Sequence, residues 1–395
     1  MVPEDAEHST QKYAYIDSLR GYAVLMVITC HVGSAFAQMP YPIKKLTNVG
    51  WHGVQLFFLV SCVTLMMSWR SDERKGIATP LAFWRRRFFR IAPMYYLAAL
   101  FYFLVKRPAG GFDLVQLVSS LSFINAWNPN WTPTVLDKWS VVPGGWSIGV
   151  EFTFYILFPI VVTSIRSVRT GLIFFFLAVF IGCIANSAGL HFLLPTFGKT
   201  ATDNFLYFWL PNQMPIFAMG TLLFFAIDGA HASPPVFLTR YPLAIIFSCA
   251  AGFIFFAEAQ APLPMDFTAW PLRPFPVLLI ESVFLWVAAL TIATNPAGIL
   301  VNRPLRAMGE VSFSAYIFHF FVVHQLATVP VLFDTSRTGY TAIATFGLLW
   351  LATVLLTFLL SSITFRFIEK PMIEFGRARI IPAHERPKLD SPNGE

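Results

Sequence analysis

The sequence predicts an all-α membrane protein, a bundle of about ten transmembrane helices with its N- and C-termini in the cytoplasm. Hydrophobic residues make up 56% of the 395 residues and charged residues only 12%, against roughly 45–50% and about 25% in soluble domains. Apolar runs of about 17–25 residues, each long enough to cross a bilayer, recur from Leu19 almost to the C-terminus. Positive charge gathers between alternate runs, which indicates a fixed orientation in the membrane.

The apolar runs define the predicted spans in chain order. A further run, from Leu114 to Trp127, is shorter and ends among polar residues, so we expect it to be interfacial or re-entrant. The ten predicted spans are 19–38, 53–69, 91–106, 147–165, 171–188, 206–228, 241–258, 275–294, 310–332 and 341–366.

The distribution of Lys and Arg supports this assignment. With ten crossings and a cytoplasmic N-terminus, 20 of the 28 Lys and Arg residues lie in the cytoplasm and eight lie outside. Counting the run 114–127 as a crossing would invert the later spans and export the loop that carries Arg303 and Arg306. Because positive residues mark cytoplasmic loops, ten crossings are favoured. The net charge of +7 therefore reflects the excess of Lys and Arg in the cytoplasmic segments, and we expect no nucleic-acid partner.

The chain divides into three predicted parts. Residues 1–18 form a cytoplasmic segment without the apolar core of a signal peptide, 19–370 form the transmembrane domain, and the Pro-containing residues 371–395 form a disordered cytoplasmic tail. All four cysteines lie in apolar runs without CxxC spacing. We therefore expect neither a disulfide framework nor a metal site.

Ionisable residues within the spans are costly and mark candidate sites. Arg20 and His31 are eleven residues apart, so they share one helix face about 16 Å apart along the axis, with Asp17 on the same stripe. A neutral imidazole suits proton transfer. Alternatively, Arg20 is an interfacial anchor and His31 bridges two helices.

The fourth span carries Ser147, Glu151 and Tyr155, spaced i, i+4, i+8 on one face. Glu151 is expected about one turn inside the outer boundary, where its carboxylate could accept a hydrogen bond from an imidazole or a sugar hydroxyl. A structural ion pair is the alternative.

Two arginines lie before the third span, at Arg87 and Arg90. Their i, i+3 spacing can present two guanidinium groups to one anion, which suits phosphate. Basic clusters also flank most cytoplasmic helix ends and attract anionic lipid.

The ninth span carries Tyr316 and His319 on one face. His319 falls about 14 Å into the span, close to the depth of His31. Two histidines at one level indicate a polar cavity, although a hydrogen bond between helices is an alternative reading.

Taken together, these residues resemble the integral membrane acyltransferase-3 family, which O-acetylates bacterial surface and exported polysaccharides. The resemblance covers most of the chain. The sequence differs from the usual family pattern at three positions. Gln55 stands where an acid is frequent, Cys62 where glycine is expected, and Lys370 where arginine is usual. The motifs that carry the resemblance are Leu19-Arg20-Gly21 with His31, the pair Arg87/Arg90, the block Trp146-Ser147 to Glu151 and Tyr155, and Ser312-Phe313-Ser314-Ala315-Tyr316 before His319.

The resemblance implies a ten-helix core in the bacterial inner membrane and acyl-CoA, above all acetyl-CoA, as co-substrate without a bound cofactor. The acceptor is then a carbohydrate or glycolipid, and polysaccharide-assembly proteins are expected partners. His31 and Glu151 are the expected catalytic residues, and Arg20, Arg87 and Arg90 the donor-binding ones. Supporting roles fall to Asp17, Ser147, Tyr155, Tyr316 and His319.

The predicted function is O-acyl transfer from cytoplasmic acyl-CoA to a hydroxyl of a surface or exported carbohydrate. His31 would act as a general base, or it would carry a transient acyl group. A secondary transporter is the alternative, but the sequence lacks the two related halves that many transporters show. Neither the acceptor nor the choice between acetyl and succinyl follows from the residues.

Overall fold

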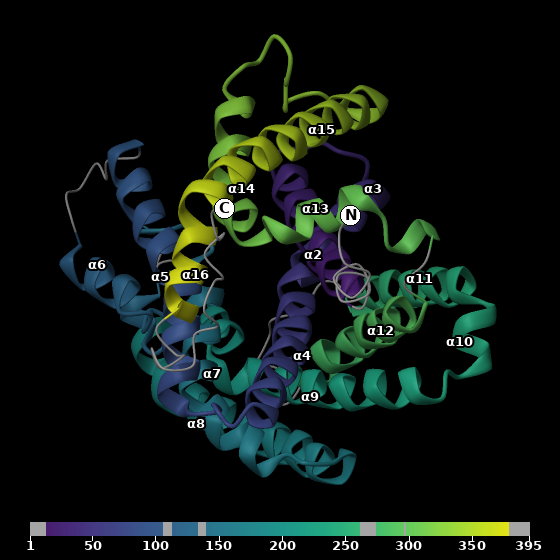
Figure 1. Cartoon of the computed structure of the whole chain (residues 1–395). Helices are drawn as coiled ribbons and strands as arrows, with labels where there is room; N and C mark the ends of the chain where they lie inside the picture. The colour runs from purple at the N-terminus through teal and green to yellow at the C-terminus, as the bar shows by residue number, and fades with distance from the viewer. Residues whose placement is uncertain (1–12, 106–112, 133–139, 261–273, 296–297, 379–395) are drawn as a thin grey trace, which may run out of the picture.

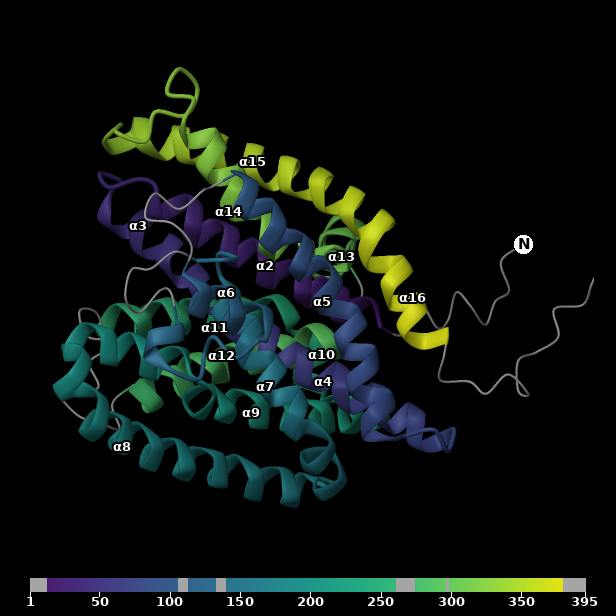
Figure 2. The ribbon, with the colours of Figure 1, turned by 90° about the vertical axis from the view of Figure 1, so that its left-hand side faces the viewer.

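A computed structural model describes residues 13–105, 113–132, 140–260, 274–295 and 298–378. These residues form helices and connecting turns, with no strand among them (Figure 1). The predicted all-helical class is therefore confirmed. A second view shows α15 and α16 along one edge of the bundle and α8 along the opposite edge (Figure 2).

Each predicted span coincides with a helix. By length and composition, five helical stretches can cross a membrane, namely Tyr41–Arg74, Pro80–Val105, Gly145–Ser164, Val168–Ala232 and Gly339–Ala378. The helices at the predicted spans are α2 (Ala14–Ser34), α4 (Gly53–Arg74), α5 (Pro80–Val105), α7 (Gly145–Ser164), α8 (Val168–Phe208), α9 (Leu210–Ala232), α11 (Pro242–Gln260), α12 (Pro274–Thr294), α14 (Ser312–Ala327) and α15 (Gly339–Thr364).

The run 114–127 contains only the eight-residue helix α6 (Leu114–Leu121). At 1.5 Å per residue, this helix is about 12 Å long and cannot cross a bilayer. The prediction that this run is not a crossing agrees with its structure.

Two helices differ in length from their predicted spans. Helix α8 has 41 residues and kinks at Gly198, whose φ of 73° lies in the left-handed region that glycine tolerates. Helix α5 begins at Pro80, well before the predicted start at residue 91. The predicted spans end at charged or polar residues, whereas the backbone hydrogen bonding of the helices continues through them.

The tail begins later than predicted. Lys370–Ala378 form helix α16, which follows a π-helical turn (Phe365–Glu369), so residues 371–378 are not disordered. Phe375 packs against Phe89 of α5 with ring centroids 5.0 Å apart, and this apolar contact fixes the helix. Residues 1–12 and 379–395 lie outside the described part.

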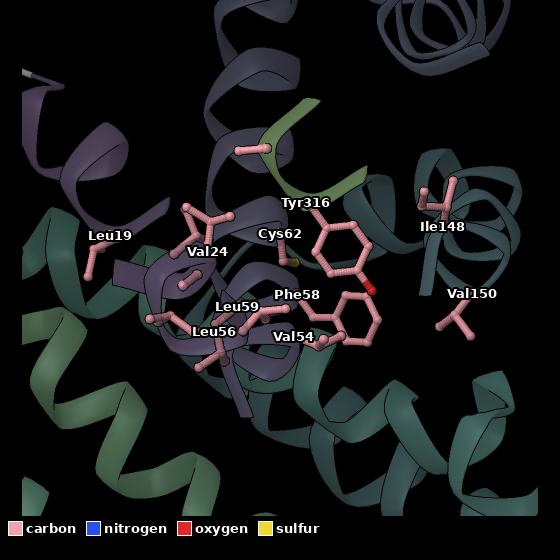
Figure 3. Packing of buried hydrophobic residues seen from close by; sticks show 14 of the residues in the cluster. Leu19, Val24, Val54, Leu56, Phe58, Leu59, Cys62, Ile148, Val150 and Tyr316 are labelled. Atoms are coloured by element: carbon pink, nitrogen blue, oxygen red, sulfur yellow. The ribbon is translucent and has the colours of Figure 1, made fainter. Parts of the chain in front are cut away.

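Helix α2 packs against two other helices that line the candidate site, α4 and α14. Short α13 (Arg303–Glu310) and α15 also pack against α2. Figure 3 shows Leu59 and Cys62 of α4 between Val24 of α2 and Tyr316 of α14. This packing brings helices together that lie far apart in the sequence.

Contacts along α2 set the directions of its neighbours. Asp17 lies against Gly309, just before α14 begins, and His31 lies against His319 within α14, so α2 and α14 run parallel. Helix α4 runs the opposite way, because its Gly53 lies against Ala23 and its later Thr64 contacts Arg20.

Candidate active site

A cavity of about 80 Å³, lined by charged, polar and apolar side chains, lies between α2, α4, α5, α7 and α14. Its lining comes from five helices that are distant in the sequence, which only the tertiary structure can bring together. Seven of the ten predicted site residues line it: Arg20, Arg87, Arg90, Ser147, Glu151, Tyr155 and Tyr316.

Glu151 is held in this cavity by two hydroxyl groups. Ser61 Oγ donates a hydrogen bond of 2.5 Å to its carboxylate, and the Tyr155 hydroxyl donates one of 2.6 Å. Within the described residues, Glu151 makes no hydrogen bond to His31. Of the two partners considered for Glu151, an imidazole and a sugar hydroxyl, the imidazole is therefore not bonded to it in the described structure.

The predicted depth of Glu151 was also wrong. Helix α7 begins beside Tyr95, in the middle of α5, because Gly145 packs against the Tyr95 hydroxyl. Further along α7, the Trp84 indole near the start of α5 donates a 2.9 Å hydrogen bond to the Tyr155 carbonyl. Glu151 therefore lies with the arginines near the start of α5 and not near the outer boundary.

Arg20 reaches the cavity from the first turns of α2. Its Nη2 donates a 3.3 Å hydrogen bond to Thr64 Oγ1, and its Nη1 lies 4.0 Å from Asp17 Oδ1. Asp17 itself does not line the cavity. The two contacts orient the guanidinium between α2 and α4.

Arg87 and Arg90 both line the cavity, as their spacing predicts. The Arg87 guanidinium lies 5.5 Å from the Phe83 ring, and its Nε is buried without a hydrogen-bond partner in the described structure. Arg86, by contrast, forms an ion pair with Asp72. Arg87 is thus available to bind an anion.

His31 and His319 form a separate cluster beside the cavity. Their ring centroids are 5.2 Å apart, which confirms that the two histidines lie at one level. His319 is fully buried, its Nδ1 lies 3.1 Å from the Ala315 carbonyl oxygen, and its Nε2 has no partner among the described residues. Half-buried His31 also packs against Phe320, at 4.3 Å between centroids.

Tyr316 connects the two clusters. Its ring centroid lies 5.8 Å from that of His319, while its hydroxyl lies 2.8 Å from Ser147 Oγ and 3.1 Å from the Gly144 carbonyl oxygen. Tyr316 therefore forms the wall between the histidine pair and the arginine-lined cavity.

The α4 residues that position the charged groups of the site were not predicted from the sequence. Ser61 and Thr64 lie three residues apart on one face of α4 and bind Glu151 and Arg20. Hydroxyl residues at i, i+3 in an apolar span are the only sequence signal, and they more often bond to their own helix backbone.

A buried pair elsewhere in the bundle was likewise not predicted from the sequence. His52 Nε2 lies 3.2 Å from Glu281 Oε2, and both side chains are buried. Nearby, Gln55 donates a 3.1 Å hydrogen bond to Tyr207. Glu281 lies within a predicted apolar span, and an acid there is the signal that could have found the pair.

Comparison with known proteins gives the class of the molecule. The chain is 26% identical over 396 aligned residues to the acyltransferase MdmB of Streptomyces mycarofaciens, covering 95% of each chain. It is 24% identical over 353 residues to the exopolysaccharide production protein ExoZ of Rhizobium meliloti, covering 85% of this chain and 93% of ExoZ.

A third relative is longer than this chain. The alignment with the O-acetyltransferase OatA of Staphylococcus aureus is 22% identical over 382 residues and covers 91% of this chain but 57% of OatA. No solved structure matches the chain. The model of an acyltransferase domain, Acyl_transf_3, matches residues 13–366. A match across this much of the chain, on a bundle of apolar helices, shows that the protein is a multi-pass membrane acyltransferase of the acyltransferase-3 family.

Proposed function

We propose that this acyltransferase moves an acyl group, above all acetyl, from cytoplasmic acyl-CoA to a hydroxyl of a cell-surface or exported carbohydrate. Two of its relatives carry the names exopolysaccharide production protein and O-acetyltransferase, which supports this choice of acceptor. Membership of an acyltransferase family favours the enzyme over the secondary transporter. The observation that carries the proposal is the cavity that joins three arginines to Glu151, next to the paired histidines.

The arginines suit a polyanionic donor. Arg20, Arg87 and Arg90 meet at the cavity, and guanidinium groups bind phosphate through paired, charge-assisted hydrogen bonds. We therefore assign the phosphates to the arginine-rich edge and the thioester to the interior.

His31 is the proposed general base. Its imidazole takes the proton of the acceptor hydroxyl as the oxygen attacks the thioester carbonyl carbon. The carbon–sulfur bond then breaks, and the CoA thiolate recovers the proton from the imidazolium, which leaves an O-acyl ester and free CoA. Transfer through a transient acyl-imidazole on His31 is the second route and consumes the same reactants.

Glu151 then acts on the donor side of the site. Its two hydrogen bonds fix the carboxylate near the arginines, where it can hold their guanidinium groups in place between donor molecules. Tyr316 would separate the donor end from the histidines until the thioester passes it.

The proposed setting is the bacterial inner membrane, crossed ten times with both termini in the cytoplasm. Acyl-CoA then approaches the arginines from the cytoplasm, and the acceptor approaches His31 from the outer side. The 20-to-8 distribution of Lys and Arg supports this orientation.

Substitution of His31 tests the chemistry in cells. In a strain lacking the gene, His31→Ala should reduce O-acyl groups on surface glycans at least 100-fold relative to wild type, since a positioned acid–base group contributes roughly 10²–10⁴-fold. NMR of extracted glycans measures the O-acyl signals, and immunoblotting measures protein level.

His324→Ala is the matched control, because His324 lies near the far end of the same helix as His319 and is exposed. We expect it to restore wild-type acylation. A well-expressed His31→Ala protein with full activity would overturn the assignment of His31. Unchanged glycan acylation upon loss of the gene would instead remove the proposed carbohydrate acceptor.

A further inference from the structure

A fourth arginine, Arg306, lies beside the arginine-lined cavity. It belongs to the short helix α13, which packs closely on the first turns of α2. Two glycines allow this approach: a Cβ added to Gly309 would lie 1.7 Å from the Asp17 carbonyl oxygen, and one added to Gly21 would lie 2.3 Å from the Leu305 carbonyl oxygen. The backbone contact fixes Arg306 next to Asp17.

Arginines outnumber the acids in this region. The Asp17 carboxylate interacts electrostatically with Arg20, Arg90 and Arg306, and no Arg20–Asp17 contact is shorter than 4.0 Å. Glu151 interacts with Arg20 and Arg87, and Glu369 interacts with Arg90. Three carboxylates thus face four guanidinium groups, so the cluster keeps a net positive charge that attracts anions.

Two guanidinium groups in this region have buried N–H groups without partners. The Nε atoms of Arg306 and Arg87 are both buried, and neither has a hydrogen-bond acceptor in the part of the chain that the structure describes. A buried donor without an acceptor is costly, more so when it is charged. An oxyanion bound in this region would supply the acceptor that such a group lacks.

The position of Arg306 relative to the cavity follows from the residues it interacts with. Arg306 does not line the cavity but shares Asp17 with two arginines that do. It is therefore placed at the edge where phosphates would bind.

We propose that Arg306 completes a phosphate-binding site with Arg20, Arg87 and Arg90, and that this site takes the phosphate groups of acyl-CoA. The inference rests on the proposed function, since it assigns a place to the donor of that reaction. A phosphate-bearing lipid headgroup presents the same chemistry, and the test separates the two sources.

Equilibrium binding to the full-length protein in phosphatidylcholine nanodiscs tests the site. Arg306→Ala should raise the Kd for CoA about tenfold, because a charge-assisted hydrogen bond to phosphate is lost. The Kd for pantetheine, which lacks the nucleotide and its phosphates, should stay unchanged. Arg306→Lys, which keeps the charge but loses the planar fork, should give an intermediate Kd for CoA.

Arg303→Ala is the matched control, because Arg303 lies on the same helix and is exposed. It should bind CoA as the wild type does. If the Arg306→Ala protein unfolds, Arg306→Lys alone is the test. A wild-type Kd for CoA in Arg306→Lys would then contradict a role of the Arg306 guanidinium in phosphate binding.

Other outcomes are equally decisive. Wild-type affinity for CoA in Arg306→Ala would overturn the proposal. So would a loss of phosphatidylglycerol binding, measured by native mass spectrometry, without any change in CoA binding, because the site would then serve a lipid headgroup. A wild-type protein that binds no CoA would overturn the proposed function itself.

Discussion

Opposite charges in the candidate site are held by two hydroxyl residues on one helix. Ser61 bonds to Glu151 and Thr64 bonds to Arg20, so one face of α4 positions the carboxylate from α7 and the guanidinium from α2. Both bonds involve a charged partner, and such bonds are stronger than those between neutral groups. We therefore expect these two residues to position the charged groups of the site.

Removal of the Ser61 hydroxyl should impair the enzyme without unfolding it. We expect Ser61→Ala to lower glycan O-acylation about tenfold, because a hydrogen bond to a charged group contributes roughly 1.5–3 kcal/mol. Ser61→Thr should recover activity by keeping the hydroxyl. NMR of O-acyl groups, normalised to protein level, measures both variants.

Ser362→Ala provides the comparison, because the one hydrogen bond of the Ser362 hydroxyl within the described residues is to the Phe358 carbonyl oxygen of its own helix. It should leave acylation unchanged. Equal activity of Ser61→Ala and Ser362→Ala would mean that the Ser61 bond does not position Glu151 for the reaction.

At the scale of elements, buried polar contacts tie α12 to the start of α4. His52 ends the 3-10 turn η1 (Val49–His52) before α4, and it meets Glu281 of α12. The His52 Nδ1 atom has no partner in the described structure, so Glu281 supplies the one hydrogen-bonding contact found for this ring. The pair therefore specifies how α12 packs against the α2–α4 unit.

Loss of Glu281 should destabilise the bundle. Glu281→Ala leaves the His52 ring buried without its partner, which costs about 1–3 kcal/mol, so we expect a lower Tm in detergent. Glu281→Gln should lower the Tm less, because its amide oxygen still reaches the ring. Intrinsic-fluorescence melting of the purified proteins measures the differences.

Glu374→Ala serves as the reference, since Glu374 is exposed on α16 and surface substitutions usually change stability by less than about 0.5 kcal/mol. If Glu281→Ala and Glu374→Ala melt together, the buried pair contributes nothing to packing.

At the scale of the whole molecule, orientation follows from charge. The loop with Arg303 and Arg306 and the segment before α15 are predicted on opposite sides, since the span 310–332 lies between them. Alkaline phosphatase is active only outside the cytoplasm. A fusion after Asn302 should therefore be inactive and a fusion after Arg337 active.

Green fluorescent protein fused to the same positions gives the reciprocal readout, because it becomes fluorescent in the cytoplasm. Phosphatase activity after Asn302 would mean an odd number of crossings before it, and ten crossings would then be wrong.

Much of this architecture could be predicted from the sequence. Apolar runs matched helices at all ten positions, because a segment that crosses hydrocarbon must satisfy its backbone internally. Helical periodicity also predicted which residues share a face, and Ser147, Glu151 and Tyr155 do line one cavity. The similar depth of His31 and His319 was likewise predicted, because the rise per residue fixes how far each side chain lies along its helix.

Only the tertiary structure decided how these faces meet. The start of α7 beside Tyr95, the bonds from Ser61 and Thr64, the pair of His52 with Glu281 and the contact of α13 with α2 join segments far apart in the chain. Local periodicity fixes the faces of a helix, but the axial position of one helix against another depends on close packing between them. Glu151 shows this: its helix and its face followed from the sequence, whereas its partners and its place beside the arginines followed from packing.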